Sequence, residues 1–120
     1  MKLLARALVL GAAVFALGCG PDYDRTEISG IVALSDGECT RERITVRHGT
    51  VLKVHIVSKD DGNDDMTNSV SSAHPTILEV APVISDHDYA FLGISPGHTE
   101  VEIKAEGKTV LIIDAFVTAQ

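Results

Sequence analysis

Basic residues are scarce in this sequence. The 120 residues contain 10 Lys and Arg against 17 Asp and Glu, which gives a formal net charge of −7 at pH 7. Two of the basic residues, Lys2 and Arg6, lie in a segment that we expect to be removed, and the formal charge then becomes −9. Because nucleic acids and anionic lipid headgroups repel such a domain, the composition excludes nucleic-acid binding and gives no electrostatic attraction to a membrane.

Cysteine is also scarce, since the sequence contains only Cys19 and Cys39. If Cys19 carries a lipid, as argued below, Cys39 has no partner within the chain and the domain folds without a disulfide. The simplest interpretation of Cys39 is a small buried apolar side chain or a tolerated loop position. An intermolecular disulfide through Cys39 is the alternative.

Signatures of catalysis and of zinc binding are missing. There is no Gly-x-Ser-x-Gly turn, and Asp86, His87 and Asp88 are neighbours in one turn without a positioned nucleophile. No two of the five histidines lie within four residues of each other, whereas zinc sites favour close spacing on one element. We therefore expect neither an enzyme nor a histidine-based metal centre.

Helical periodicity is missing after residue 20. No window keeps apolar residues at i, i+3, i+4 and i+7, and short β-branched segments alternate with turns instead. Seven or eight short strands at this spacing predict an all-β fold, a single antiparallel β-sandwich. The alternation places five residues in the core: Leu52, Val54, Ile56, Val101 and Ile103. It places three on the surface: Glu100, Glu102 and Lys104.

The sequence predicts the local structure of three further segments. A two-residue hairpin at His48-Gly49 would put the apolar sets of the flanking strands on opposite faces, so we expect the chain to cross between two sheets there. The polar segment 59–69 is expected to be a loop. The segment 109–118 is nearly all apolar, which is typical of a strand covered on both faces.

The first twenty residues have the organisation of an export signal. Lys2 and Arg6 are followed by an uncharged apolar run, 7–18, which is too short to span a bilayer but suits the core of a signal peptide. The run ends in Ala16-Leu17-Gly18-Cys19, which resembles the lipobox of bacterial lipoproteins. The resemblance implies cleavage before Cys19 and lipid attachment to it. Gly20 is not the Asp that retains such proteins at the inner membrane of enteric bacteria, so the resemblance favours the outer membrane.

The chain thus divides into three expected parts. Residues 1–18 form the signal peptide, residues 19–26 the lipidated Cys19 with a short tether, and residues 27–120 the sandwich domain. The short tether would keep the domain close to its membrane.

A second resemblance covers the sandwich itself. It covers Ile44–Val117. The segments that carry it are Ile44-Thr45-Val46 with Gly49, the run Ser71-Ser72-Ala73-His74-Pro75-Thr76-Ile77, the run Ser95-Pro96-Gly97-His98-Thr99-Glu100-Val101-Glu102-Ile103, and a closing apolar strand. They look like a bacterial immunoglobulin-like domain of the second group, as found in intimin- and invasin-like adhesins. The chain departs from that pattern at Val70, where an aromatic residue is usual, and at 82–88, where a small-Gly-small turn is usual. The resemblance implies a spacer, an adhesive module or an accessory part, without shared catalytic residues.

One cluster offers ligands for a cation. Five oxygen-bearing residues lie within six positions: Asp60, Asp61, Asn63, Asp64 and Asp65. Hard cations such as Ca²⁺ want six to eight oxygen ligands, which a flexible loop can offer. The order differs from that of an EF-hand loop, and a solvated loop has the same composition.

These observations predict a membrane-anchored envelope lipoprotein whose immunoglobulin-like domain acts in binding, adhesion or structural support. Apart from the covalent lipid on Cys19, we expect no cofactor. The partners would be the membrane, through the lipid, and a protein or polysaccharide of the envelope. The alternative is a periplasmic Ca²⁺-binding protein that uses the segment Asp60–Asp65.

Overall fold

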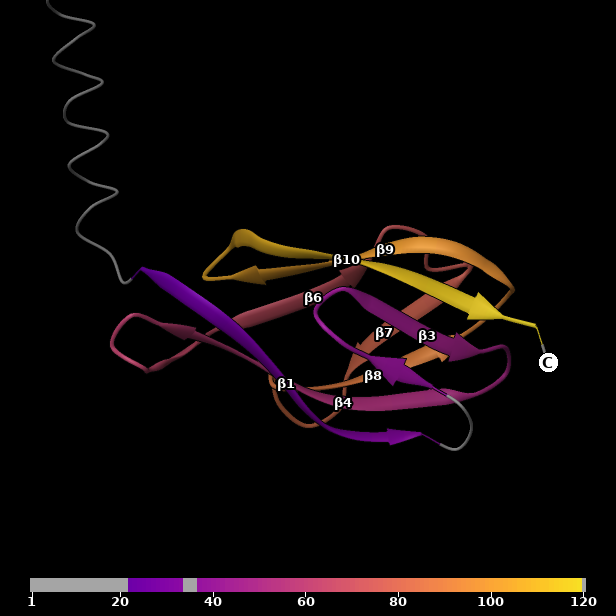
Figure 1. Cartoon of the computed structure of the whole chain (residues 1–120), viewed down its shortest axis with the longest axis horizontal. Coiled ribbons are helices and arrows are strands. Elements are labelled where there is room, and N and C mark those ends of the chain that lie inside the picture. Colours follow the sequence, from indigo (N-terminus) through magenta and orange to yellow (C-terminus); the bar gives the residue numbers. More distant parts are fainter. Residues whose placement is uncertain (1–21, 34–36, 120) are drawn as a thin grey trace, which may run out of the picture.

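The computed structural model describes residues 22–33 and 37–119, and over these residues the chain forms ten β-strands without a helix (Figure 1). The strands are β1 (Tyr23–Ala33), β2 (Glu38–Cys39), β3 (Arg43–Arg47), β4 (Val51–Asp60), β5 (Asp65–Met66), β6 (Asn68–Ser72), β7 (Leu78–Pro82), β8 (Asp88–Gly93), β9 (Gly97–Ala105) and β10 (Lys108–Thr118). The expected all-β fold is confirmed. The count exceeds the expected seven or eight because β2 and β5 have only two residues each. In this part of the chain no helix is long and apolar enough to span a membrane.

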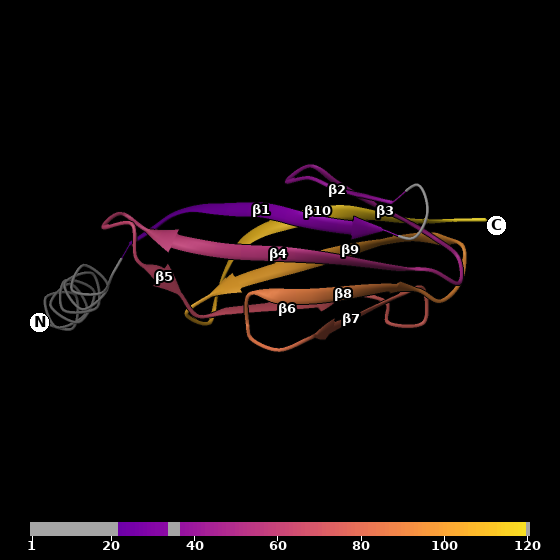
Figure 2. The ribbon, with the colours of Figure 1, turned by 90° about the horizontal axis from the view of Figure 1, so that it is seen from below.

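The strands form two sheets, the layers of a sandwich (Figure 2). The first sheet has the order β1-β4-β8-β7, with β5 added beside the end of β4, and the second has the order β2-β3-β10-β9-β6. The expectation of a purely antiparallel fold is wrong at one place, because β3 and β10 pair in parallel. After β3 the chain crosses to the first sheet. The strand that pairs with β3 in parallel is β10, the last strand of the described chain.

One face of each sheet forms the core. Phe91 and Leu52 of the first sheet and Ile44, Ile103 and Ile113 of the second are almost fully buried. All five predicted core residues have 3% or less of their surface exposed, so the period-two pattern identified the inner faces correctly.

The three residues of β9 that were predicted to be exposed differ in how much of their surface is exposed. Glu100 is exposed, but Glu102 and Lys104 are only partly exposed. The Glu102 carboxylate accepts a hydrogen bond from Thr109 Oγ1 at 2.6 Å and lies 3.8 Å from Lys104 Nζ. Contacts with side chains on the same face, which alternation alone does not reveal, therefore cover part of both residues.

The connections follow from local backbone chemistry. At His48-Gly49 the chain crosses from the second sheet to the first, as expected, and Gly49 has the positive φ of 80° that the turn requires. The β9–β10 hairpin closes through Glu106 and Gly107, with φ of 50° and 80°. Two successive positive φ angles are typical of a type I′ turn, which matches the twist of the strands.

The sandwich begins earlier than the sequence pattern predicts. β1 starts at Tyr23, inside the expected tether. Thr26 is 2% exposed, and its hydroxyl lies 3.0 Å from Ser58 Oγ and 2.9 Å from Tyr23 Oη. These polar contacts fix a segment that lacks apolar alternation, and the start of the domain moves from residue 27 to residue 23.

Two other expectations need correction. The segment 59–69 is not one loop, because β4 extends to Asp60 and the strands β5 and β6 follow after a short turn. The segment 109–118 is not covered on both faces, since Ile112 is 54% exposed and Asp114 points to solvent. On this outer face Ile112 and Asp114 are exposed, whereas the Phe116 ring is covered by the His98 ring, with 4.7 Å between centroids, and by the Arg43 guanidinium at 4.4 Å.

The described chain enters and leaves the sandwich at opposite ends. Tyr23 pairs with Asp60, the last residue of β4. Thr118, the last residue of β10, accepts a hydrogen bond from His48 N at 2.8 Å, just before β4 begins. Since the ten residues of β4 span about 33 Å, β1 starts roughly that far from the end of β10, and Figure 1 shows these points at opposite ends of the long axis.

Candidate functional sites

The candidate cation ligands lie in a tight turn between β4 and β5. The Asp60 carboxylate accepts hydrogen bonds from the backbone N–H groups of Gly62 and Asp64, at 2.9 and 3.0 Å. Asn63 has the left-handed φ of 67°, which asparagine tolerates better than most residues. Asp60 is thus the residue that shapes this turn, because its oxygen Oδ1 satisfies two backbone donors.

Two basic side chains, Lys59 and Arg25, contact other members of the predicted ligand set. Asp65 Oδ1 accepts a hydrogen bond from Lys59 Nζ at 2.7 Å, and this contact holds the pKa of Asp65 below its ordinary value. Arg25 donates a hydrogen bond to the Asn63 side chain. Asp61 and Asp64 are exposed. The structure therefore brings the five predicted residues into one turn, but it directs them to different local contacts.

In the described part of the chain, no three His, Cys, Asp or Glu side chains are grouped so that they could hold a metal ion. Ca²⁺ needs six or more converging oxygens, and here the oxygens of Asp60 and Asp65 already accept protein donors. The arrangement explains the composition of this segment as a stable polar turn.

A thermal melt tests the cation hypothesis. We expect the same melting temperature in EDTA and in 1 mM Ca²⁺, because the turn is closed by its own hydrogen bonds. Occupation of a site at 100 times its Kd would stabilise the fold by about 2.7 kcal/mol and raise the melting temperature by several degrees. Such a rise, lost in the variant Asp61→Asn/Asp64→Asn, would establish the cation site instead.

A histidine–aspartate contact joins β4 and β8 on the outer face of the first sheet. His55 Nδ1 lies 2.9 Å from Asp88 Oδ1, and this hydrogen bond lowers the pKa of Asp88. Ser85 Oγ donates to the other oxygen of Asp88, at 3.4 Å. The order of contacts is therefore serine–aspartate–histidine. A catalytic triad needs the histidine between the other two, where it can take the serine proton, so this group does not activate a nucleophile.

A second polar group, which we call the inter-sheet latch, consists of Asn68, Asp86 and Tyr89. Asp86 Oδ2 accepts from the backbone N–H of Asn68 at 2.9 Å, and Asn68 Nδ2 donates to the carbonyl of Ile56 at 2.8 Å. Tyr89 Oη donates to the Asp86 carbonyl at 2.6 Å. Burial, with a smaller contribution from the Asp86 charge, raises the pKa of Tyr89 to about 12. The latch ties β6 of the second sheet to the first sheet.

Sequence reasoning missed the latch. Asp86 appeared as one residue of a polar turn, and Asn68 as part of a loop. One signal was present, because asparagine is disfavoured in strands and an Asn in a strand needs a specific partner. Asn68 is 5% exposed, and its Oδ1 has no hydrogen-bond partner among the described residues.

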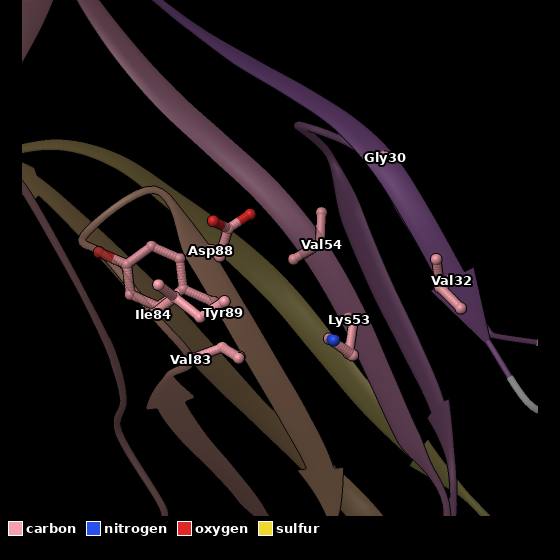
Figure 3. A pocket seen from close by; sticks show the side chains of 8 residues that line it. All are labelled: Gly30, Val32, Lys53, Val54, Val83, Ile84, Asp88 and Tyr89. Carbon is pink, nitrogen blue, oxygen red and sulfur yellow. The ribbon is translucent and has the colours of Figure 1, made fainter.

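A shallow hollow of about 230 Å³ lies on the outer face of the first sheet (Figure 3). Val32, Val83 and Ile84 border it together with Lys53 and Asp88, and Ile84 has 90% of its surface exposed. Small-molecule sites usually have about 300–1,000 Å³ and converging polar groups. The hollow is smaller than that, and its open apolar rim suits a surface contact better than catalysis.

One of the two cysteines, Cys39, lies in the described part of the chain. Cys39 is 3% exposed, and burial raises the pKa of its thiol to about 12. Because the thiolate is the reactive form, this thiol is inert at neutral pH, in agreement with its simplest interpretation as a buried apolar side chain. Cys19, the predicted lipidation site, lies outside the described residues.

No family model matches the sequence, and no curated protein is similar to it. Solved structures are similar in fold. A crystal structure of domains 4 and 5 of the S-layer protein SbsC superimposes with a TM-score of 0.55 at 20% identity, covering 79% of this chain and 54% of that chain. A structure of SbsC domains 4–9 has a TM-score of 0.56 at 19% identity, covering 80% of this chain and 15% of that one.

These similarities establish the fold. The chain spans about half of the two-domain structure and 14% of a structure of SbsC domains 1–6. The matched proteins are thus considerably longer, and the likeness concerns the sandwich alone. The prediction of a two-sheet all-β sandwich is confirmed by the strands of this chain and by their superposition on the S-layer domains.

Proposed function

We propose that this protein is a bacterial envelope lipoprotein whose sandwich serves as a non-catalytic structural or binding module. One observation carries the proposal. The start of β1 and the end of β10 lie about 33 Å apart, at opposite ends of the sandwich. With a lipid on Cys19, three residues before Asp22, the first end lies near the membrane, and the length of the sandwich allows the second end to reach about 33 Å farther out.

The absence of catalytic geometry supports a structural role. Within residues 22–33 and 37–119, Ser85 Oγ donates to the Asp88 carboxylate and accepts only from the backbone N–H of His87, and Cys39 is buried as a thiol. The S-layer domains that resemble this chain belong to a surface-layer protein, and a module of the same fold suits the envelope. Since one fold hosts many functions, this likeness supports the location more than a particular partner.

The finer features of the proposal come from the sequence. The lipobox-like Ala16–Cys19 supports cleavage and lipidation, and Gly20 favours the outer membrane. The segments that resemble bacterial immunoglobulin-like domains of the second group support an adhesive, spacer or accessory role. The partners that we propose are the membrane, through the lipid, and an envelope protein or polysaccharide. The covalent lipid is the only cofactor proposed.

Substitution of Cys19 tests the anchor. In cells supplied with labelled palmitate, we expect the wild-type protein to take up label and the Cys19→Ala variant to take up none and to remain an uncleaved precursor. Cys39→Ala is the matched control and should be labelled and cleaved as the wild type is, because Cys39 is buried in the sandwich. Equal labelling of Cys19→Ala and the wild type would contradict the proposal.

A further inference from the structure

The outer face of the first sheet carries few polar side chains. Strand pairing places four residues side by side across this face, one from each of its long strands: Val32, Lys53, Ala90 and Ala81. Lys53 and Ala81 are exposed, so the row lies on the outer face. An antiparallel sheet that faces water usually has polar residues on its outer face, whereas in this row only Lys53 is polar. The row therefore has the composition of a sheet face that another molecule covers.

Exposed aliphatic side chains collect around this row. In the described residues six large hydrophobic side chains are exposed, and four of them lie near the end of β1 or directly after β7: Ile31, Val32, Val83 and Ile84. Val32, Val83 and Ile84 border the hollow of about 230 Å³ described above, and Figure 3 shows Lys53 between Val32 and the segment 83–84. Exposed apolar patches on soluble domains often mark contacts with other proteins.

Two opposite charges border the same hollow. Lys53 of β4 pairs with Ala90 of β8, and Asp88 lies two residues before Ala90 on the same face. The Lys53 ammonium makes no hydrogen bond or ion pair with another residue of the described chain. Asp88 is hydrogen-bonded to His55 and Ser85, and a carboxylate has further lone pairs. Both charges can therefore receive a partner from another molecule.

The face is complementary to a second copy of itself. A twofold axis that lies between two such faces, midway between the backbone positions of Lys53 and Asp88 and perpendicular to the line joining them, exchanges the two positions. Each Lys53 then faces the Asp88 of the other copy, and both ion pairs form at once. The same rotation brings Val32 of one copy toward the segment 83–84 of the other, because these residues lie on opposite sides of Lys53 (Figure 3). Ala90 lies close to the axis, where its small side chain lets the two sheets approach.

We propose that the outer face of the first sheet is the interface of a homodimer, in which two copies pack face to face about this axis. The partner is a second copy because one rotation pairs both charges and covers the exposed aliphatic residues. A bilayer is a poor alternative, since the carboxylates of Asp88 and Glu79 lie on this face and oppose contact with anionic headgroups. The proposal rests on the binding role of the proposed function but does not require the lipid on Cys19.

The size of the face sets the strength of the contact. The six residues of β8 span about 20 Å, and the four long strands measure about 19 Å across. Such a face is smaller than the roughly 800 Å² that each partner contributes to a standard interface. We therefore expect a weak dimer, which is best detected in intact membranes, where extraction does not dilute the protein.

Cross-linking through Ala90→Cys tests the interface. Packed sheets lie about 10 Å apart, so a bis-maleimide of about that span can join two cysteines near the axis. In membranes of cells that produce the protein, we expect Ala90→Cys to give a cross-linked dimer. Ser69→Cys, at an exposed position of the second sheet, should give no more dimer than the unsubstituted protein, whose own cysteines set the background.

Charge reversal tests the position of the axis. In the Ala90→Cys background, Lys53→Asp and Asp88→Lys each set like charges against each other in the dimer, and each should lower the dimer fraction about fivefold or more. Lys108→Asp makes the same charge change as Lys53→Asp at an exposed position of the second sheet, and it should leave the fraction unchanged. Production of the first two variants in one cell, with one of them tagged, should restore the dimer as a tagged–untagged pair, because each reversed residue then faces an opposite charge.

The outcomes separate the second copy from other occupants. A dimer fraction for Ala90→Cys no greater than for Ser69→Cys would overturn the proposal, and so would a loss on charge reversal that the mixed production does not restore. A cross-link from Ala90→Cys to a different protein, without dimer, would show that the face has another partner and would overturn the homodimer. Failure of palmitate labelling concerns the anchor alone, so the two proposals fail separately.

Discussion

Replacement of Phe91 by alanine is expected to lower the free energy of unfolding by about 3–5 kcal/mol. Phe91 lies in the middle of β8, is fully buried, and is among the largest side chains in the core. Its removal takes away apolar contacts and leaves a cavity between the two sheets, which the paired strands cannot close by collapse. Urea unfolding monitored by circular dichroism measures the loss.

A milder substitution at the same position is the control. Phe91→Leu keeps most of the side-chain volume and should cost clearly less than Phe91→Ala. A loss below 1 kcal/mol for Phe91→Ala would show that Phe91 is not at the centre of the core, and it would contradict the packing of the two sheets described above.

Replacement of Gly93 by alanine is expected to cost about 1–3 kcal/mol, as overpacking of a well-packed site usually does. A Cβ atom at Gly93 would lie 2.7 Å from the backbone oxygen of Arg47 and 3.1 Å from a methyl carbon of Val117. Backbone cannot move aside as a flexible side chain can. The substitution therefore forces apart β3 and β8, which belong to different sheets.

Gly62→Ala is the matched control, and the same urea unfolding experiment applies. A Cβ at Gly62 would meet only the side chains of Asp60 and Asp64, at 3.3 and 3.8 Å, in an exposed turn. We expect a change within about 0.5 kcal/mol, as for other surface substitutions. Equal losses for the two variants would show that the close approach at Gly93 does not limit the packing.

The regular strands could be predicted from the sequence, and the polar segments could not. Alternation placed Leu52 and Val101 correctly because side chains on a half-buried strand point alternately inward and outward. Thr26 and Asn68 escaped the same reasoning. Their burial depends on partners that are distant in sequence, Ser58 for Thr26 and the Ile56 carbonyl for Asn68, and no local pattern reveals such contacts.

The candidate cation site, too, was predictable in its composition but not in its contacts. Sequence reasoning identified the turn Asp60–Asp65 as polar but could not say how its oxygens would be used. Asp65 contacts Lys59 only because β5 folds back beside the end of β4. The contact of His55 with Asp88 depends on the register between β4 and β8, which no turn signal in the sequence sets.

The start of β1 shortens the tether that the sequence pattern predicts. Strand β1 begins at Tyr23, beside Asp60, and β10 ends beside His48 at the other end of the sandwich. With the proposed lipid on Cys19, the domain would lie closer to the membrane than a tether ending at residue 26 implies.

The mass of the intact protein extracted from bacterial membranes tests the central claim most directly. We predict a chain that begins at Cys19, lacks residues 1–18, and carries the added mass of lipid on its N-terminal residue. A full-length chain beginning at Met1, without added lipid mass, would contradict the account.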